Sequence, residues 1–236
     1  MKWNFVNKAY FVLSVILLMA IGIKIFRYKR WDRYYYFSSV STPYHFPIAI
    51  RNCYFLFPNS DEDAYFNTEH VNQFNSTWGN DYFFAEVHEP QRLPEKLVVE
   101  YVSYREKSFY SDTIPLPTEK IKTCFKEAEQ HNQLEKMYNA GTDKKGLKFH
   151  LGIANNGHII LWLRGIKMEN VLLKTQLKPH EPSKAETFYV KQLTKEAYFK
   201  KVFERLPDSL RLEFEKGTDA QANYIDSPSH YLEREP

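Results

Sequence analysis

Two histidines beside a tight turn are the residues of this 236-residue chain whose spacing most directly suggests chemistry. His150 and His158 flank an Asn-Gly pair at Asn156-Gly157, and Asn-Gly between apolar runs is a strong β-hairpin signal. If the two strands pair around this turn, the imidazoles approach each other and could bind a metal or respond to pH. The alternative is that both are polar residues on the solvent face of the hairpin. We favour this alternative.

A second candidate is the acidic stretch between Pro58 and Asn75. It contains five side chains that could bind a cation: Asp61, Glu62, Asp63, Glu69 and His70. Their spacing does not fit an EF-hand, because no glycine stands at the sixth position and no glutamate closes the loop. We therefore expect a solvated loop over this stretch and no metal site.

The two cysteines, Cys53 and Cys124, are the remaining nucleophile candidates. Either could act with one of the eight histidines, but nothing in the sequence brings such a pair together. They could equally form one disulfide or remain two buried thiols, and two cysteines are too few to decide. The chain has no Gly-rich phosphate loop and no G-x-S-x-G motif. We expect no catalytic, cofactor-binding or metal-binding residues, and the pattern favours a protein that is not an enzyme.

The composition indicates one β-rich domain. Hydrophobic residues make up 43% of the chain, and aromatics are abundant, with 17 Tyr, 18 Phe and 4 Trp against 8 Gly. Aromatic side chains favour strands and bury large areas. The net charge of +3 is close to neutral, which argues against a nucleic-acid-binding surface.

The N-terminal region, residues 1–33, has the character of a membrane anchor. Ala9–Phe26 is apolar apart from Lys24, which can snorkel from near one end, and a spanning helix needs about 20 residues. A cleaved signal peptide ending near Ala20-Ile21-Gly22 is the alternative. We favour the uncleaved helix, because apolar residues continue past Gly22. A basic run that suits lipid headgroups then follows: Arg27, Lys29, Arg30 and Arg33.

Strands are expected where runs of alternating, aromatic and β-branched, or continuously apolar residues lie between turn signals. The expected strands are residues 34–40, 46–57, 82–87, 97–104, 109–114, 147–153, 158–163 and 171–177, with turns that include Arg164-Gly165. A long helix is expected over residues 118–138 with Thr118 as its N-cap, because apolar residues follow helical spacing there. Thr194 should cap a second helix, and Pro207 should open a third.

Together these elements predict an α+β fold: a mainly antiparallel β-sheet with one long helix and a helical C-terminal region, after one N-terminal transmembrane helix. The soluble domain should cover residues 34–217 with roughly seven or eight strands, followed by a loosely ordered polar tail, residues 218–236. An antiparallel meander is expected, because short strands bounded by turns dominate and no βαβ alternation is visible.

Several motifs along the soluble part resemble a bacterial family known as domain of unknown function 2931. They are TPYHFPI (42–48), TWG (77–79), LPEKLVVEYVSYREKSFY (93–110), IPLPTEKI (114–121), LGIANNGHIILWLRG (151–165) and YFKKVFERLPDSLRLEFEKG (198–217). The resemblance brings no catalytic residues, since the family has no assigned activity. It implies a protein of the bacterial envelope, where members are often lipoproteins, but this chain has no cysteine directly after its apolar segment, where a lipid would be attached.

The expected location and function follow from the N-terminal apolar segment and from the family resemblance. The basic residues on either side of the apolar segment weakly favour a cytoplasmic domain, whereas the resemblance implies an envelope one. We expect a single-pass inner-membrane protein with the domain on the periplasmic side. The expected function is binding of a protein partner without catalysis. One version of this function is that of an immunity-type protein. The alternative is an envelope hydrolase or a small-ligand-binding domain with an aromatic-lined pocket.

Overall fold

The computed structural model describes residues 4–28, 32–58, 63–82, 89–137 and 144–233. Its first element is the helix α1 (Phe5–Tyr28). Within it, Phe5–Phe26 is long and apolar enough to cross a membrane, with a mean hydropathy of 2.4 and no buried residues. An anchor and a signal peptide both have these properties, so α1 could serve as either.

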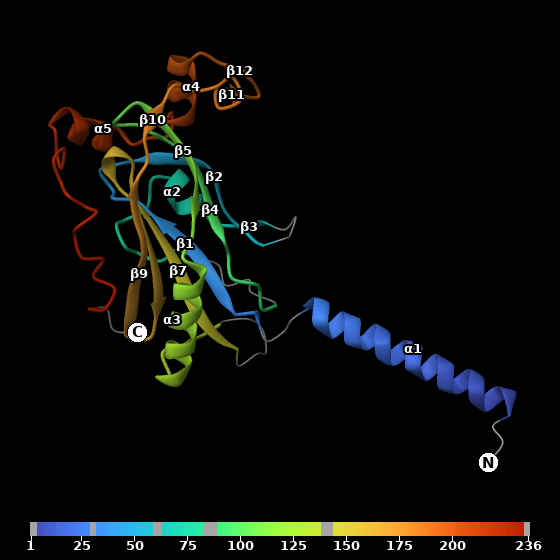
Figure 1. The fold of residues 1–236 in the computed structure, drawn as a ribbon. Coiled ribbons are helices and arrows are strands. Elements are labelled where there is room, and N and C mark those ends of the chain that lie inside the picture. The colour runs from blue at the N-terminus through green and yellow to red at the C-terminus, as the bar shows by residue number, and fades with distance from the viewer. Residues whose placement is uncertain (1–3, 29–31, 59–62, 83–88, 138–143, 234–236) are drawn as a thin grey trace.

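The rest of the described chain is built on two five-stranded sheets (Figure 1). The first sheet has the order β1 (Tyr36–Ser41), β7 (Lys145–Ile153), β8 (His158–Gly165) and β9 (Met168–Gln176), with β6 (Glu135–Lys136) on β7. The second has the order β10 (Pro179–His180), β5 (Ser108–Pro115), β4 (Lys96–Ser103), β2 (Ile48–Leu56) and β3 (Asp63–Tyr65). A small hairpin, β11 (Phe188–Tyr189) and β12 (Lys191–Gln192), stands apart from both.

The fold class is confirmed as α+β with mostly antiparallel pairing, but the simple meander is wrong. β1 pairs with β7 in parallel, over six residue pairs from Tyr36↔Leu147 to Ser41↔Gly152. Local patterning cannot reveal this pairing, because more than 100 residues separate the two strands. The number of strands among the described residues also exceeds the seven or eight expected, since several strands are only two or three residues long.

The main core lies between the two sheets and takes one face of each strand. On β7 this face is Leu147, Phe149, Leu151 and Ile153, all fully buried. The rings of Tyr36 and Phe55 each lie 5.1 Å from the ring of Phe149, as edge-to-face pairs. The helix α3 (Thr118–Gln130) adds its apolar face to this core through Ile121, Cys124, Phe125 and Ala128.

A second apolar cluster covers the outer face of the second sheet. Val102 and Phe109 of that face pack against two short helices, α4 (Lys195–Val202) and α5 (Asp208–Glu215). Both helices begin as the sequence indicates: the Thr194 hydroxyl accepts a hydrogen bond from the Ala197 amide, and α5 starts directly after Pro207. The helices and the β4–β5 turn lie together at one end of the domain (Figure 1).

Four local expectations need correction. The stretch 58–75 is not simply an exposed loop: it contains β3 and the short helix α2 (Glu69–Asn72), and it buries Phe66, Val71 and Phe74. α3 ends at Gln130, well before residue 138, because Asn132 adopts a φ of 55° and the chain then pairs as β6.

The other two corrections concern a cap and a turn. Thr118 is the first helical residue and not the cap of α3, and its hydroxyl donates to the Pro94 carbonyl. Arg164 and Gly165 stay within β8, and the turn follows them at Ile166-Lys167, where Lys167 has a φ of 52°. The strand expected at 82–87 lies, except for Tyr82, outside the described residues.

Candidate functional site

A cluster of buried charged side chains lies on the face of the first sheet that points away from the main core. Side chains alternate along a strand, so Lys148 and His150 of β7 point opposite to Leu147 and Phe149. Arg164 of β8 lies on the same outer face. His150 and Arg164 are 0% exposed and Lys148 is 8% exposed, which is rare for these residue types.

Asp81 is the central partner of this cluster. It lies in the segment after Trp78 and places one oxygen, Oδ1, 2.6 Å from Arg164 Nη1 and 3.0 Å from His150 Nδ1. The other oxygen, Oδ2, lies 3.1 Å from Lys148 Nζ. One carboxylate thus contacts three buried basic side chains, and removing it would leave part of their charge uncompensated, which is destabilising.

Two glutamates form further ion pairs with the same basic side chains. Arg164 Nε donates to Glu169 at 2.8 Å, and Lys148 Nζ lies 2.9 Å from Glu135. The C-terminal residues close the cluster from outside: the Ser229 hydroxyl donates to Glu169 at 2.6 Å, and the Tyr231 hydroxyl donates to Glu135 at 2.6 Å. The tail is therefore packed at these two residues, contrary to the loosely ordered tail expected from its composition.

The cluster also contains a Ser–His–Asp connection. Ser41 Oγ lies 2.8 Å from His150 Nε2, and the opposite ring nitrogen, Nδ1, faces both Ser39 Oγ at 2.6 Å and Asp81 Oδ1 at 3.0 Å. With a proton on Nδ1, the neutral imidazole donates to Asp81 and accepts from the Ser41 hydroxyl, which is the connectivity of a serine hydrolase triad. However, Ser41 is 0% exposed and its Oγ accepts the Gly79 amide hydrogen at 3.1 Å. A substrate cannot reach this hydroxyl unless the covering segment moves.

The covering segment fits closely against the sheet because of one glycine. A Cβ at Gly152 of β7 would lie 2.7 Å from the ring of Trp78 and 2.6 Å from the ring of Trp162. The two indole rings meet edge to face at 5.5 Å. Gly152 therefore allows Trp78 to lie directly on the strand and to hold Asp81 over the basic residues.

The pKa values of the central pair follow from burial and charge. Burial and the nearby Arg164 guanidinium lower the pKa of His150 to about 4, although Asp81 opposes this shift. For Asp81, burial alone would raise the pKa, but the hydrogen bond from His150 and the charges of Arg164 and Lys148 hold it well below its usual range. At neutral pH the cluster thus contains a neutral imidazole beside an ionised carboxylate.

The structure separates the two histidines that the sequence placed beside one turn. His150 lies opposite Trp162 of β8, whereas His158 pairs with Gln176 of β9, and its Nδ1 donates to the Asn155 carbonyl at 3.0 Å. The solvent-face interpretation is wrong for His150, which is fully buried. The spacing of Lys148 and His150, two residues apart between apolar neighbours, indicates that they share one face of the strand. Their partner Asp81 could not be predicted in this way, because it is distant in sequence.

The other sequence candidates do not form a site among the described residues. Cys53 and Cys124 are both free and buried, and burial raises the pKa of each thiol, which disfavours the reactive thiolate. His70 of α2 stacks on Tyr82 with ring centroids 4.3 Å apart. Asp61 and Glu62 lie outside the described residues, and no three His, Cys, Asp or Glu side chains within them are grouped as a metal site.

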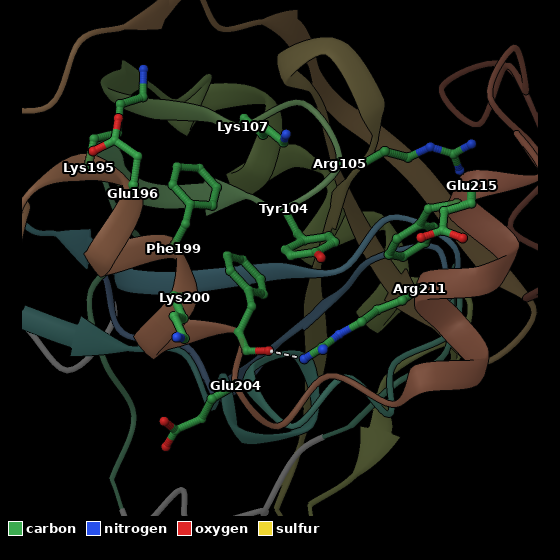
Figure 2. A pocket seen from close by; sticks show the side chains of 12 residues that line it. Tyr104, Arg105, Lys107, Lys195, Glu196, Phe199, Lys200, Glu204, Arg211 and Glu215 are labelled. Atoms are coloured by element: carbon green, nitrogen blue, oxygen red, sulfur yellow. Dashed lines mark hydrogen bonds between the residues drawn. The ribbon is translucent and has the colours of Figure 1, made fainter.

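An open groove is the second candidate, at the end of the domain that carries α4 and α5 (Figure 2). It has a volume of about 900 Å³. Its floor is aromatic: Tyr104, Phe199, Phe203 and Phe214. Its rim is charged: Arg105, Lys107, Lys195, Glu196, Lys200, Glu204, Arg211 and Glu215. Three separate stretches form it, namely the β4–β5 turn and the two helices, so it could not be foreseen from local patterns.

Two arginines fix the shape of this groove. The guanidinium of Arg105 lies 4.7 Å from the ring centroid of Phe46 and 5.4 Å from that of Phe214. Arg211 of α5 donates to the Phe203 carbonyl at 3.2 Å, a contact that joins α5 to the end of α4 (Figure 2). These contacts leave the aromatic floor partly open to solvent: Tyr104, Phe199 and Phe214 are each only partly buried.

The chain is thus an α+β protein of two packed sheets, with a closed ionic cluster on one outer face and an open aromatic groove on the other. A family model described as "Protein of unknown function (DUF2931)" matches residues 28–226, and the protein belongs to this family. This confirms the resemblance drawn from the motifs. No curated protein and no solved structure matches the chain.

Proposed function

We propose that this protein is a non-enzymatic binding protein of the bacterial envelope, held in the inner membrane by Ala9–Phe26 with its domain on the periplasmic side. The observation that carries the binding proposal is the open groove, whose aromatic floor is framed by charged side chains. Aromatic residues and arginine in a partly exposed hollow are the residue types that dominate binding energy at protein interfaces. The apolar helix α1 supports the tether.

A partner protein suits this groove better than a small molecule. Pockets for small ligands enclose most of the ligand surface. Here the floor is open to solvent, because only Phe203 is fully buried in the cluster beneath, and the three other rings beside it are partly exposed. A protein segment can cover such an open surface without being enclosed.

One specific form of the proposal is an immunity-type protein, which neutralises a secreted toxin by binding it. A tethered binding domain would meet a toxin at the membrane surface. The test is protection: cells that express a toxin encoded beside this gene should grow when the full chain is present. If growth is not restored, the immunity form is wrong, while binding of another partner is still addressed by the next experiment.

The binding proposal is tested by site-specific photo-crosslinking in the native cells. A benzoylphenylalanine at Glu204, on the groove rim, should give a discrete higher-mass adduct of the full-length protein. The matched control is the same probe at Lys126, an exposed residue of α3 outside the groove. Equal adducts, or none, at the two positions would contradict binding at the groove.

The membrane side is tested separately by a reporter fused after Pro236. Alkaline phosphatase, which folds in an oxidising compartment, should be active, and a cytoplasmic reporter at the same position should be inactive. The reverse result would overturn the periplasmic assignment. The binding proposal does not depend on this outcome.

A hydrolase is the second candidate, and the Ser41–His150–Asp81 connection is the observation that favours it. The test is labelling with a fluorophosphonate, which reacts with activated serines. We expect no labelling of the folded protein, because Ser41 is fully buried. Labelling that disappears in Ser41→Ala would establish the hydrolase in place of the binding protein.

A further inference from the structure

The rim of the groove carries more positive than negative charge. Five basic side chains face three acidic ones across the aromatic floor. Some of these are already satisfied: Lys195 binds Glu181, Glu204 binds Lys201, and Arg211 lies 3.6 Å from Asp208. What distinguishes the rim is therefore the set of charges that remain outside such pairs.

Three basic side chains of the rim have no ion pair within the described part of the chain: Arg105, Lys107 and Lys200. Two acidic ones, Glu196 and Glu215, also have none there. Arg105 is held in place by Phe46 and by its 3.2 Å hydrogen bond to the His45 carbonyl, so its charge is fixed at the groove. Lys107 is on the β4–β5 turn and Lys200 is on α4, and both are exposed.

The groove also lies at the end of the domain opposite the entry of the chain from α1. The chain enters at Tyr36, beside Leu147 at the start of β7, whereas β7 ends near the turn at Asn155–Gly157. There the Asn156 amide donates to Glu106 of the β4–β5 turn, which forms one wall of the groove. A bilayer that holds α1 therefore approaches the other end of the domain, and it is not the expected occupant.

We infer that the groove takes an acidic segment of a partner protein that carries an aromatic or aliphatic anchor. The anchor packs on Tyr104, Phe199 and Phe214, and the carboxylates on either side of it meet Arg105, Lys107 and Lys200. Complementary charge of this kind raises the association rate and selects the partner, while the apolar anchor supplies most of the affinity. The inference rests on the proposed binding function and specifies its partner.

The test adds charge reversal to the photo-crosslinking experiment at Glu204. In one variant Lys107→Glu and Lys200→Glu are combined, and in the matched variant Glu196→Lys and Glu215→Lys are combined. We expect the first pair to reduce the adduct roughly tenfold, and the second pair to leave it unchanged or increase it. All four side chains are exposed, so both proteins should fold, and circular dichroism and thermal melting of each variant check this.

Mass spectrometry of the adduct completes the test. The expected crosslinked peptide has a net negative charge and an aromatic or aliphatic residue near the crosslink. A neutral or basic peptide, or an adduct that is equal in both variants, overturns the acidic-segment inference and leaves the binding function in place. A phospholipid adduct overturns it in favour of a membrane surface. No adduct above the Lys126 control removes the binding function itself.

Discussion

The two outer faces of the domain carry the same kinds of side chain in opposite arrangements, one closed and one open. On the first sheet, arginine, lysine and aromatic rings surround Asp81 and are sealed by Trp78 and the tail. On the second sheet, arginine, lysine and aromatic rings form an open groove with charges left unpaired on its rim. The difference lies in burial. A buried charge must be paired because leaving it unpaired is costly, whereas an exposed charge is solvated by water and can remain unpaired.

The comparison shows that the triad-like arrangement of side chains and the solvent-accessible groove lie on different faces of the domain. Ser41, His150 and Asp81 have the connectivity of a triad but no access. The groove has access but no acid–base or nucleophilic arrangement. We therefore assign the proposed binding function to the groove, and the ionic cluster joins the covering segment and the tail to the sheet. The following predictions test this division, beginning with the largest effect.

Removing the buried guanidinium of Arg164 should give the largest loss in the free energy of unfolding. Arg164→Met leaves Asp81 and Glu169 buried without their main partner, so the free energy of unfolding should fall by about 3–5 kcal/mol. Urea denaturation followed by tryptophan fluorescence measures this loss. A loss below about 1 kcal/mol would mean that water reaches the cluster and that it is not sealed.

The cluster should also make stability depend on pH. Unfolded histidine binds a proton below about pH 6.5, whereas His150 in the folded protein stays neutral down to about pH 4. The unfolded state therefore binds more protons between these values, and the free energy of unfolding falls as the pH is lowered through this window, by up to about 3 kcal/mol. Denaturation midpoints of the native chain and of His150→Gln measure it. If both have the same slope from pH 6.5 to pH 4, another group causes the dependence.

Loosening the tail should have an intermediate effect. Tyr231→Phe keeps the ring that lies 4.6 Å from the Arg164 guanidinium but removes the hydrogen bond to Glu135. We expect a loss of about 1.5 kcal/mol, typical of a hydrogen bond to a charged group. Hydrogen exchange of residues 224–233 should increase in the same variant. Unchanged exchange would show that the tail is held by other contacts.

The smallest effect should come from the groove. Lys200→Met removes an exposed charge that has no ion pair among the described residues, so the free energy of unfolding should change by less than about 0.5 kcal/mol. The substitution keeps a side chain of similar length, so it is the matched counterpart of Arg164→Met. A loss comparable to that of Arg164→Met would remove the distinction between a structural cluster and a binding groove.

The parts of the fold that the sequence predicts are those that depend on near neighbours. The Asn156-Gly157 turn is a clear example, since both residues adopt the positive φ values, 56° and 75°, that such a pair tolerates. Alternating or continuously apolar runs between turn signals predict the strands β2, β4, β5, β7 and β8, and Thr194 with the apolar spacing after it predicts α4. These signals lie within a few residues of the element that they define.

The rest depends on contacts between distant parts of the chain. The parallel β1–β7 pair and the bond from Asp81 to Lys148 and Arg164 join segments more than 60 residues apart. The sequence predicts a turn at Arg164-Gly165, directly after the apolar run HIILWL. In the fold Arg164 stays buried, because Asp81 and Glu169 come to it from elsewhere. The groove was missed for the same reason.

The parallel pairing of β1 with β7 has a mechanical consequence for a chain held at its N-terminal helix and bound at its groove. A pull between these two ends runs along β1, which enters the domain at Tyr36 and points toward the groove end. The hydrogen bonds between the six residue pairs of β1 and β7 are then loaded in shear and together, and they do not break one after another as in a strand that is unzipped from one end. In the proposed arrangement, with α1 as the anchor and a partner in the groove, β1 is thus oriented to carry tension between them.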